Sequence, residues 1–354
     1  MKINHNYFTN LAFNLAELNL GKTNTNPSVG CVVVKNNSVL SSGVTSINGR
    51  PHAEYNALRK EINFKDCDMY ITLEPCTHYG LTPPCTNIIK NRKIKKVYYC
   101  FDDPDTRTNK RARKILNRSK ISVKKITSKK NNFYKGYFLN KKKKLPLIDA
   151  KIALSKDFLT INRKSKWITN DRSRKVGHLI RSRYDAILST SKSINKDNSL
   201  LNCRINGFDY HKPDLFIIDR NLKIKNKLKL FNISKKRKTY LFTNKTDKKK
   251  VNFLKKKNIK VIQIKELKKK YEFIHLFQKM FELGKTRILV EAGLIFLNEL
   301  LRFKLINDLY AFTSNKKLKN NGYNNTFNHI KKYSFKNKKK VNLNGDFLHK
   351  IRIR

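Results

Sequence analysis

Two short segments in the first quarter of the chain carry residue types that together suit a metal site. His52 and Glu54 stand in a Pro-His-Ala-Glu sequence, and Cys76 and Cys85 each follow a proline farther along. One imidazole and two thiolates suit a catalytic Zn²⁺ whose fourth position holds a water molecule. A single histidine is more often a helix cap, and two cysteines are often small core residues, but their combination here is uncommon by chance. The pattern therefore predicts a zinc site made by His52, Cys76 and Cys85.

Glu54 is predicted to be the proton carrier of this site. It cannot point in the same direction as His52, but from the same helical turn its carboxylate reaches a metal-bound water. Zn²⁺ lowers the pKa of such a water, and a neighbouring carboxylate takes the proton and passes it to a leaving group. This division of roles is found in zinc deaminases of nucleobases, in which the glutamate is not a ligand.

Three prolines predict how the ligands are presented. Proline is favoured in the first turn of a helix, so Pro51 predicts that His52 lies at a helix N-terminus. Pro75 and Pro84 predict the same place for the cysteines that follow them. Backbone amide dipoles at such a place stabilise a thiolate and favour metal binding.

The elements that must hold these residues alternate between helix and strand. Apolar residues spaced three and four apart predict a helix over 7–20. Continuous apolar runs predict strands over 29–34, 69–73 and 97–101. Such strands, separated by helices, are typical of a sheet covered on both faces.

A second alternation of the same kind follows a charged run that ends in proline, which predicts a linker over 140–146. Further strands are predicted over 148–154, 186–189, 215–219, 239–242, 260–264, 288–291 and 309–312, and helices over 170–182, 248–256, 271–283 and 295–302. We therefore expect two α/β domains, 1–144 and 145–354, each with its own core. The lysine- and asparagine-rich stretch 315–340 predicts no definite element.

The chain is strongly basic. Its 354 residues include 80 lysines and arginines but only 25 aspartates and glutamates, which gives a formal net charge of +55. A nucleic-acid or anionic-membrane partner would explain it, as would lysine and asparagine enrichment of the whole chain. The basic runs are scattered and form no single stripe, which favours enrichment. The sequence shows neither an apolar run of about 18 residues nor a secretion signal, so we expect a cytoplasmic protein without a nucleic-acid or membrane partner.

At the predicted zinc ligands the sequence resembles the cytidine-deaminase-like superfamily. Residues 72–85, TLEPCTHYGLTPPC, resemble a bifunctional riboflavin-biosynthesis family that joins a pyrimidine deaminase to a pyrimidine-ribose reductase, and residues 26–30 and 103–104 fit it too. The resemblance implies a three-layer α/β/α sandwich with one Zn²⁺. It implies hydrolytic deamination of 2,5-diamino-6-(5-phosphoribosylamino)pyrimidin-4(3H)-one, with Glu54 as the catalytic residue and Asn26 in the substrate pocket.

The second half resembles the reductase of that family through residues 165–169, 197–204 and 290–293. This resemblance implies a dihydrofolate-reductase-like α/β domain that uses NADPH to form 5-amino-6-(5-phosphoribitylamino)uracil. That fold binds NADPH without a G-x-G-x-x-G turn, and the chain contains no G-x-G pair.

Site residues of the reductase domain follow from the resemblance position by position. Those implied to face the substrate are Ser165, Arg181, Leu201, Arg204 and Glu291. Those implied to contact NADPH are Ala153, Trp167, Ser193, Asp197, Gly293, Leu294, Ile295, Phe296, Leu297, Asn298 and Glu299. Arginine suits a substrate phosphate because its guanidinium pairs with two oxygens, and Gly293 before an apolar helix offers backbone N–H groups to cofactor phosphates. Core packing is the alternative role for Trp167.

The chain departs from the family where glycines are replaced, among them at Lys110, Ala112 and Phe158. A side chain at position 158 argues against the left-handed backbone that glycine adopts easily, unless the loop is rearranged. The leading hypothesis is the bifunctional deaminase–reductase. One alternative is a deaminase with a degenerate substrate-binding or dimerising C-terminal module. Another is an RNA-editing deaminase, which would need a shorter cysteine spacing and a concentrated basic groove. Formation of a homo-oligomer is left open.

Overall fold

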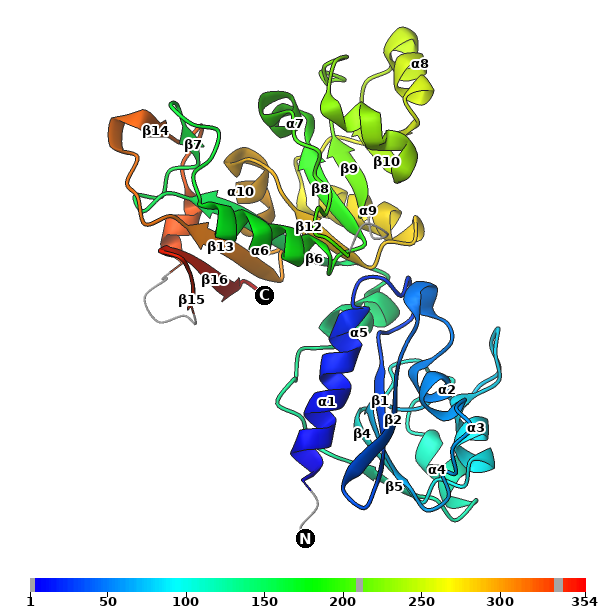
Figure 1. Cartoon of the computed structure of the whole chain (residues 1–354). Helices are drawn as coiled ribbons and strands as arrows, with labels where there is room; N and C mark the ends of the chain where they lie inside the picture. Colours follow the sequence, from blue (N-terminus) through cyan, green and yellow to red (C-terminus); the bar gives the residue numbers. More distant parts are fainter. Residues whose placement is uncertain (1–3, 208–212, 334–339) are drawn as a thin grey trace. The chain divides into compact units, whose positions relative to one another are not determined.

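The computed structural model describes residues 4–207, 213–333 and 340–354 (Figure 1). It divides into two compact units, Met1–Lys144 and Leu145–Arg354. Within the described residues, no helix is both long and apolar enough to cross a membrane.

In its described part the first unit is built on a five-stranded sheet with the order β2-β1-β3-β4-β5. The strands are β1 (Gly30–Lys35), β2 (Ser38–Val44), β3 (Asp68–Leu73), β4 (Lys96–Phe101) and β5 (Ser122–Lys125). The helices are α1 (His5–Leu18), η1 (Ile47–Gly49), α2 (Ala53–Leu58), α3 (Cys85–Asn91), α4 (Ala112–Asn117) and α5 (Lys135–Lys143). β1 runs antiparallel to β2 and β3, whereas β4 runs parallel to β3 and β5.

Side chains of one strand alternate between the two faces of this sheet, and both faces are covered. Val32 and Val34 of β1 pack with Phe8 and Ala12 of α1. On the opposite face, neighbouring strand residues pack with α2, α3 and α4 in a second cluster that includes Cys31, Val33, Met69, Ile71, Ala57, Ile89 and Leu116. The expected three-layer α/β/α sandwich is confirmed.

The second unit contains, among its described residues, a nine-stranded sheet with the order β11-β10-β9-β8-β12-β6-β13-β16-β15 and a small β14-β7 pair. Its strands are β6 (Leu147–Leu154), β7 (Ile161–Asn162), β8 (Ala186–Thr190), β9 (Asp214–Ile218), β10 (Thr239–Thr243), β11 (Ile259–Gln263), β12 (Arg287–Val290), β13 (Asp308–Thr313), β14 (Gly322–Tyr323), β15 (Lys340–Leu343) and β16 (Asp346–Arg352). From β11 to β13 the strands are parallel, and β16 and β15 join the edge antiparallel.

Helices cover both faces of this larger sheet. They are α6 (Asp171–Arg181), α7 (Ser191–Asp197), η2 (Lys229–Lys236), α8 (Lys248–Lys256), α9 (Lys270–Glu282), α10 (Leu294–Arg302), η3 (Lys319–Asn321) and η4 (His329–Lys332). α9 and α10 pack on the face that carries Leu188, Phe216 and Val290. α7 and α8 pack on the opposite face, which carries Ile187 and Leu215.

The predicted strands and helices occur within a few residues of their expected bounds, and the deviations have local causes. The expected linker over 140–146 is wrong in its first part, because α5 continues through Lys143 and ends at Lys144 in a left-handed conformation (φ 53°). β2 was not expected because SVLSSGV is largely polar, and α7 was not expected because SKSINKD lacks an apolar stripe. The stretch 315–340 forms η3, β14, η4 and the first residue of β15 in its described part.

The argument against a left-handed backbone at Phe158 is wrong, and Lys110, another position where a family glycine is replaced, has a left-handed backbone too. Phe158 has φ 64° and Lys110 has φ 57°. Such a backbone costs roughly 1–2 kcal/mol for a residue with a side chain. The carbonyl of Phe158 accepts hydrogen bonds from Asn324 (3.1 Å) and Asn328 (2.9 Å), and the amide of Lys110 donates to Glu74 (2.9 Å), so tertiary contacts hold both turns.

Candidate active sites

The three predicted zinc ligands meet at one place in the first unit. Nδ1 of His52 lies 3.6 Å from Sγ of Cys76 and 3.4 Å from Sγ of Cys85, and the three donor atoms lie within 4.8 Å of one another. Zn–N bonds of about 2.0–2.1 Å and Zn–S bonds of about 2.3 Å at a tetrahedral angle separate nitrogen from sulfur by about 3.5 Å. Both the donor set and its spacing therefore fit Zn²⁺.

Two helices and one strand end bring these ligands together. His52 is the N-cap residue of α2, one position after Pro51, and Cys85 is the first residue of α3. Cys76 is not in a helical turn, contrary to expectation, because it lies in the loop after β3. Its sulfur nevertheless accepts a hydrogen bond from the backbone amide of Cys85 (3.2 Å) at the start of α3.

The electrostatic environment favours a thiolate at Cys76. Hydrogen bonds from the side chains of Cys85 and His52 outweigh burial and lower the pKa of Cys76 to about 4. A thiolate is the form in which cysteine binds a metal.

Glu54 lies beside the ligands in the first turn of α2, where its side chain is buried. Burial, followed by the charge of Cys76, raises the pKa of Glu54 to about 7. A carboxyl group that titrates near neutral pH accepts and donates protons with similar ease. The same pocket is lined by Asn26 and His78, so the structure brings the predicted substrate contact to the predicted catalytic group.

A supporting residue that the sequence interpretation missed is Glu74. Its buried carboxylate accepts backbone hydrogen bonds from Asp103 (3.2 Å), Lys110 (2.9 Å) and Ala112 (3.1 Å). These bonds fasten the loop before α4 to the end of β3, next to Cys76. Its position in the Glu-Pro-Cys sequence was the available signal.

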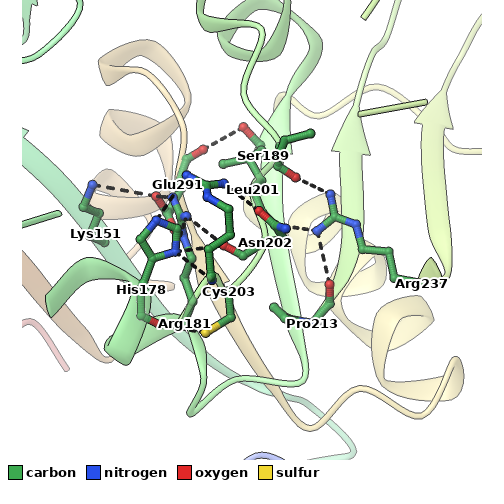
Figure 2. A network of polar contacts seen from close by, with 12 residues as sticks. Lys151, His178, Arg181, Ser189, Leu201, Asn202, Cys203, Pro213, Arg237 and Glu291 are labelled. Atoms are coloured by element: carbon green, nitrogen blue, oxygen red, sulfur yellow. Dashed lines mark hydrogen bonds and ion pairs between the residues drawn. The ribbon is translucent and has the colours of Figure 1, made fainter. Parts of the chain in front are cut away.

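In the second unit, Arg181 at the end of α6 and Glu291 just after β12 form a bidentate ion pair (Figure 2). Nε and Nη2 of Arg181 donate to the Glu291 oxygens over 2.5 and 2.8 Å, and Nζ of Lys151 lies 3.7 Å from the same carboxylate. Burial raises the pKa of Glu291, but Arg181 and Lys151 outweigh it and lower the pKa to about 2. Glu291 is therefore an anion at neutral pH.

The loop 200–204 adjoins this pair. Nη1 of Arg181 donates to the carbonyl of Asn202 (3.0 Å), and Nη1 of Arg204 donates to Oδ1 of Asn202 (2.7 Å). Burial, followed by the charges of Arg181 and Arg204, lowers the pKa of His178 to about 4. Nδ1 of the neutral ring lies 3.1 Å from the Asn202 carbonyl oxygen and 3.2 Å from the backbone amide of Arg204, and Nε2 lies 3.2 Å from Nη2 of Arg204.

Of the predicted substrate residues, Arg181, Arg204 and Glu291 thus belong to one network, which Lys151, His178 and Asn202 extend, and Leu201 precedes Asn202 in the adjoining loop. The sequence interpretation did not name Lys151, His178 or Asn202. Ser165 has a different contact, since its hydroxyl accepts from the amide of Trp167 (3.1 Å).

The predicted cofactor residues lie around the carboxyl end of the parallel strands. Gly293 is the N-cap residue of α10, and its amide donates to Oγ of Ser193 (3.1 Å). Among the described residues no side chain caps α10, and its first turn holds no acidic residue. The amides of this turn are thus available to an anion, which fits the phosphates of NADPH.

The other predicted cofactor residues differ in how far their side chains are exposed and in what they contact. Trp167 is 52% exposed with the Arg174 guanidinium carbon 4.8 Å from its ring centre, so core packing as its role is wrong. Leu294 and Leu297 are buried, and Asn298 donates to the carbonyl of Phe327 (2.7 Å). The remaining members are Ala153 in β6, Asp197 at the end of α7, and Ile295, Phe296 and Glu299 in α10.

An α/β/α unit with a buried glutamate beside one histidine and two cysteines is the arrangement of a zinc-dependent deaminase, and a mainly parallel α/β unit follows it in this chain. Residues 2–101 match the cytidine and deoxycytidylate deaminase zinc-binding region, and residues 148–316 match the RibD C-terminal domain. The chain belongs to the RibD family of riboflavin-biosynthesis proteins.

Relatives that align with most of the chain support this family assignment. Riboflavin biosynthesis protein RibD of Buchnera aphidicola is 31% identical over 331 residues, covering 89% of this chain and 88% of that protein. RibD of Aquifex aeolicus is 31% identical over 320 residues, with the same two coverages. The structure of a Thermotoga maritima diaminohydroxyphosphoribosylaminopyrimidine deaminase/5-amino-6-(5-phosphoribosylamino)uracil reductase has a TM-score of 0.81 at 25% identity and 98% coverage of both chains. Acinetobacter baumannii RibD shares the fold with a TM-score of 0.82 at 24% identity.

The protein is thus an enzyme of riboflavin biosynthesis with deaminase and reductase activities that uses Zn²⁺ and NADPH. The match of residues 148–316 to a reductase domain does not favour a degenerate C-terminal module, and relatives over nearly 90% of the chain do not favour an RNA-editing deaminase.

Proposed function

We propose that residues 1–144 deaminate 2,5-diamino-6-(5-phosphoribosylamino)pyrimidin-4(3H)-one and that residues 145–354 then reduce the ribosyl side chain to give 5-amino-6-(5-phosphoribitylamino)uracil. The observation that carries the proposal is the placement of Glu54 in one pocket with His52 and Cys76, close to Cys85. The named activities of the Thermotoga maritima relative support the choice of substrate.

In the deamination, His52, Cys76 and Cys85 would hold Zn²⁺, which supplies a Lewis acid and lowers the pKa of a bound water. Glu54 takes a proton from the attacking water and delivers it to a ring nitrogen, and then protonates the departing amino group. One water is consumed and one ammonia is released. Asn26, whose amide donates to the carbonyl of Gly49 (2.9 Å), is held in the pocket to orient the pyrimidine.

In the reduction, bound NADPH would supply a hydride to C1′ of the ribosylamino group, while the C1′–O4′ bond of the sugar ring opens and O4′ takes up one proton from solvent, which gives the ribityl chain. The first turn of α10 and the Ser193 hydroxyl would hold cofactor phosphate and polar groups at the end of the parallel sheet. Glu291, kept ionised by Arg181 and Lys151, accepts hydrogen bonds from substrate hydroxyls.

The two arginines of the substrate site have different proposed roles. The donors of Arg181 are directed at Glu291 and Asn202, which supports a role in orienting that carboxylate. Arg204 is exposed, so its guanidinium is the better candidate for the substrate phosphate.

The test is to supply the purified protein with each substrate separately. We expect ammonia release from the diaminopyrimidinone without NADPH, and NADPH oxidation with the deaminated intermediate. Ammonia release without any NADPH oxidation at high enzyme concentration would contradict the reductase half, and the reverse result would contradict the deaminase half.

A further inference from the structure

Arg237 lies at the end of η2 and is not one of the site residues described above. Its side chain reaches the loop 200–204 of the reductase site (Figure 2). We propose that Arg237 is a positioning residue that fixes this loop in the form that binds the pyrimidine substrate. The proposal rests on the proposed reductase site, because it assumes that Leu201 and Arg204 face the substrate there.

The contacts of Arg237 are made with backbone carbonyls. Nη1 donates to the carbonyls of Leu201 (2.5 Å) and Pro213 (3.2 Å), and Nη2 donates to the carbonyl of Leu200. The residue is only 7% exposed, and burial lowers its pKa to about 10, so it stays charged at neutral pH. A buried guanidinium needs acceptors, and two of the three carbonyls that accept from Nη1 and Nη2 belong to the loop, while Nε has no hydrogen-bond partner among the described residues.

The loop needs this support because its backbone is unfavourable. Leu201 has φ 48°, in the left-handed region, where a leucine side chain costs roughly 1–2 kcal/mol. Such conformations persist only where surrounding contacts determine them. Two of the three carbonyls bound by Arg237 belong to Leu201 and to the residue before it, so the guanidinium holds the strained turn itself.

Contacts one residue further along connect this turn to the substrate site. The carbonyl of Asn202 accepts from Arg181 (3.0 Å), and its side chain accepts from Arg204 (2.7 Å). Glu291, the partner of Arg181, is held from the other side by Ser189, which donates to its carbonyl (2.7 Å). A shift of the turn would therefore move Arg204 and Asn202 away from the Arg181–Glu291 pair.

The local sequence provides matched controls. Arg237 lies in the run Lys235-Lys236-Arg237-Lys238, and the three lysines of this run are exposed whereas Arg237 is buried. The effect of losing one charge from this run can therefore be separated from the effect of losing the carbonyl contacts, because K236M removes a charge but leaves the contacts of Arg237 in place.

The experiment compares R237M, R237K and K236M with wild type in the full-length protein. For R237M we expect the Kd of the deaminated intermediate, measured by calorimetry, and the reductase KM for it to rise about tenfold or more. The Kd of NADPH and the kcat/KM of deamination should stay within about twofold. R237K should lie between wild type and R237M, since one ammonium cannot bridge the separated carbonyls, and K236M should behave as wild type.

Amide hydrogen exchange over 200–204 provides a readout independent of turnover, and we expect it to accelerate in R237M and less in R237K. Unchanged exchange together with an unchanged Kd would overturn the proposal, as would a parallel loss of NADPH binding, which indicates general destabilisation. If R237M does not fold, R237K decides by the same measures. A wild type that binds the intermediate but does not oxidise NADPH contradicts the proposed function alone.

Discussion

Arg181 and Glu291, 110 positions apart in the sequence, meet in a bidentate ion pair whose N···O distances are 2.5 and 2.8 Å. Both side chains are largely buried, with 14% and 9% of their surface exposed. This contact joins the end of α6 to the end of β12 and leaves Lys151 as the second cation near the carboxylate (3.7 Å). Its geometry and burial lead to the first two predictions.

Removing Arg181 should cost stability as well as activity. We expect R181M to lower the free energy of unfolding of the second unit by about 3 kcal/mol, because Glu291 is left buried without its main partner. The double variant R181M/E291M should lose less than R181M alone. Urea denaturation of the three proteins measures this, and a double variant less stable than R181M would contradict the explanation.

The ion pair should also make stability depend on pH in the acidic range. The folded-state pKa of Glu291, about 2, lies below its ordinary value of 4.5. The ionised form is therefore favoured by folding, and its contribution is complete above about pH 4.5 and is lost as the pH falls toward 2. The stability difference between wild type and E291Q should shrink across that window. A difference that stays constant from pH 6 to pH 2.5 would rule this out.

Glu54→Gln should separate metal binding from catalysis. The variant keeps His52, Cys76 and Cys85, so we expect about one Zn²⁺ per chain, as in wild type. Without a carboxylate to move protons, ammonia release should fall by roughly 10²–10⁴-fold. NADPH oxidation with the deaminated intermediate serves as the internal control and should not change. Normal deamination by this variant would contradict the catalytic role assigned to Glu54.

Cys85→Ser should lose zinc, whereas Cys67→Ser should retain it. Both cysteines are buried in the first unit, but in the described part of the chain only Cys85 belongs to the group that includes His52 and Cys76. A hydroxyl is a much weaker zinc ligand than a thiolate. Metal analysis after extensive dialysis measures the difference. Equal zinc content in the two variants would show that the predicted triad is not the metal site.

Replacing Glu74 should affect the deaminase through its loop. Its two carboxylate oxygens accept hydrogen bonds from three backbone amides. In Glu74→Gln an NH₂ group, which cannot accept a hydrogen bond, replaces one of these oxygens, so the bonds to that oxygen are lost. We expect a loss of about 1–3 kcal/mol in the stability of the first unit, measured by thermal denaturation. Zinc should still bind, because His52, Cys76 and Cys85 are unchanged.

Local sequence was sufficient for much of this protein. Strands such as β1 and β12 are continuous apolar runs, so their type follows from burial on both faces of a sheet. The residue types and spacing of His52, Glu54, Cys76 and Cys85 were enough to predict zinc chemistry, because few other functions need that combination. Elements without such patterns, including β2 and α7, were missed because the contacts that stabilise them lie elsewhere in the chain.

Tertiary structure decided what the repeated residue types do. Among 80 lysines and arginines, sequence cannot distinguish Arg237, buried against three carbonyls, from the exposed lysines beside it. The sequence also cannot show that Arg181 forms an ion pair with Glu291. Nor can it show that Phe158 and Lys110 adopt a left-handed backbone held by side chains distant in the sequence. The physical reason is that donor direction, burial and backbone strain depend on residues brought together by folding. The sequence by itself determined the chemistry of the zinc site and the two α/β units, and the folded chain decided which of its many cations shape the second site.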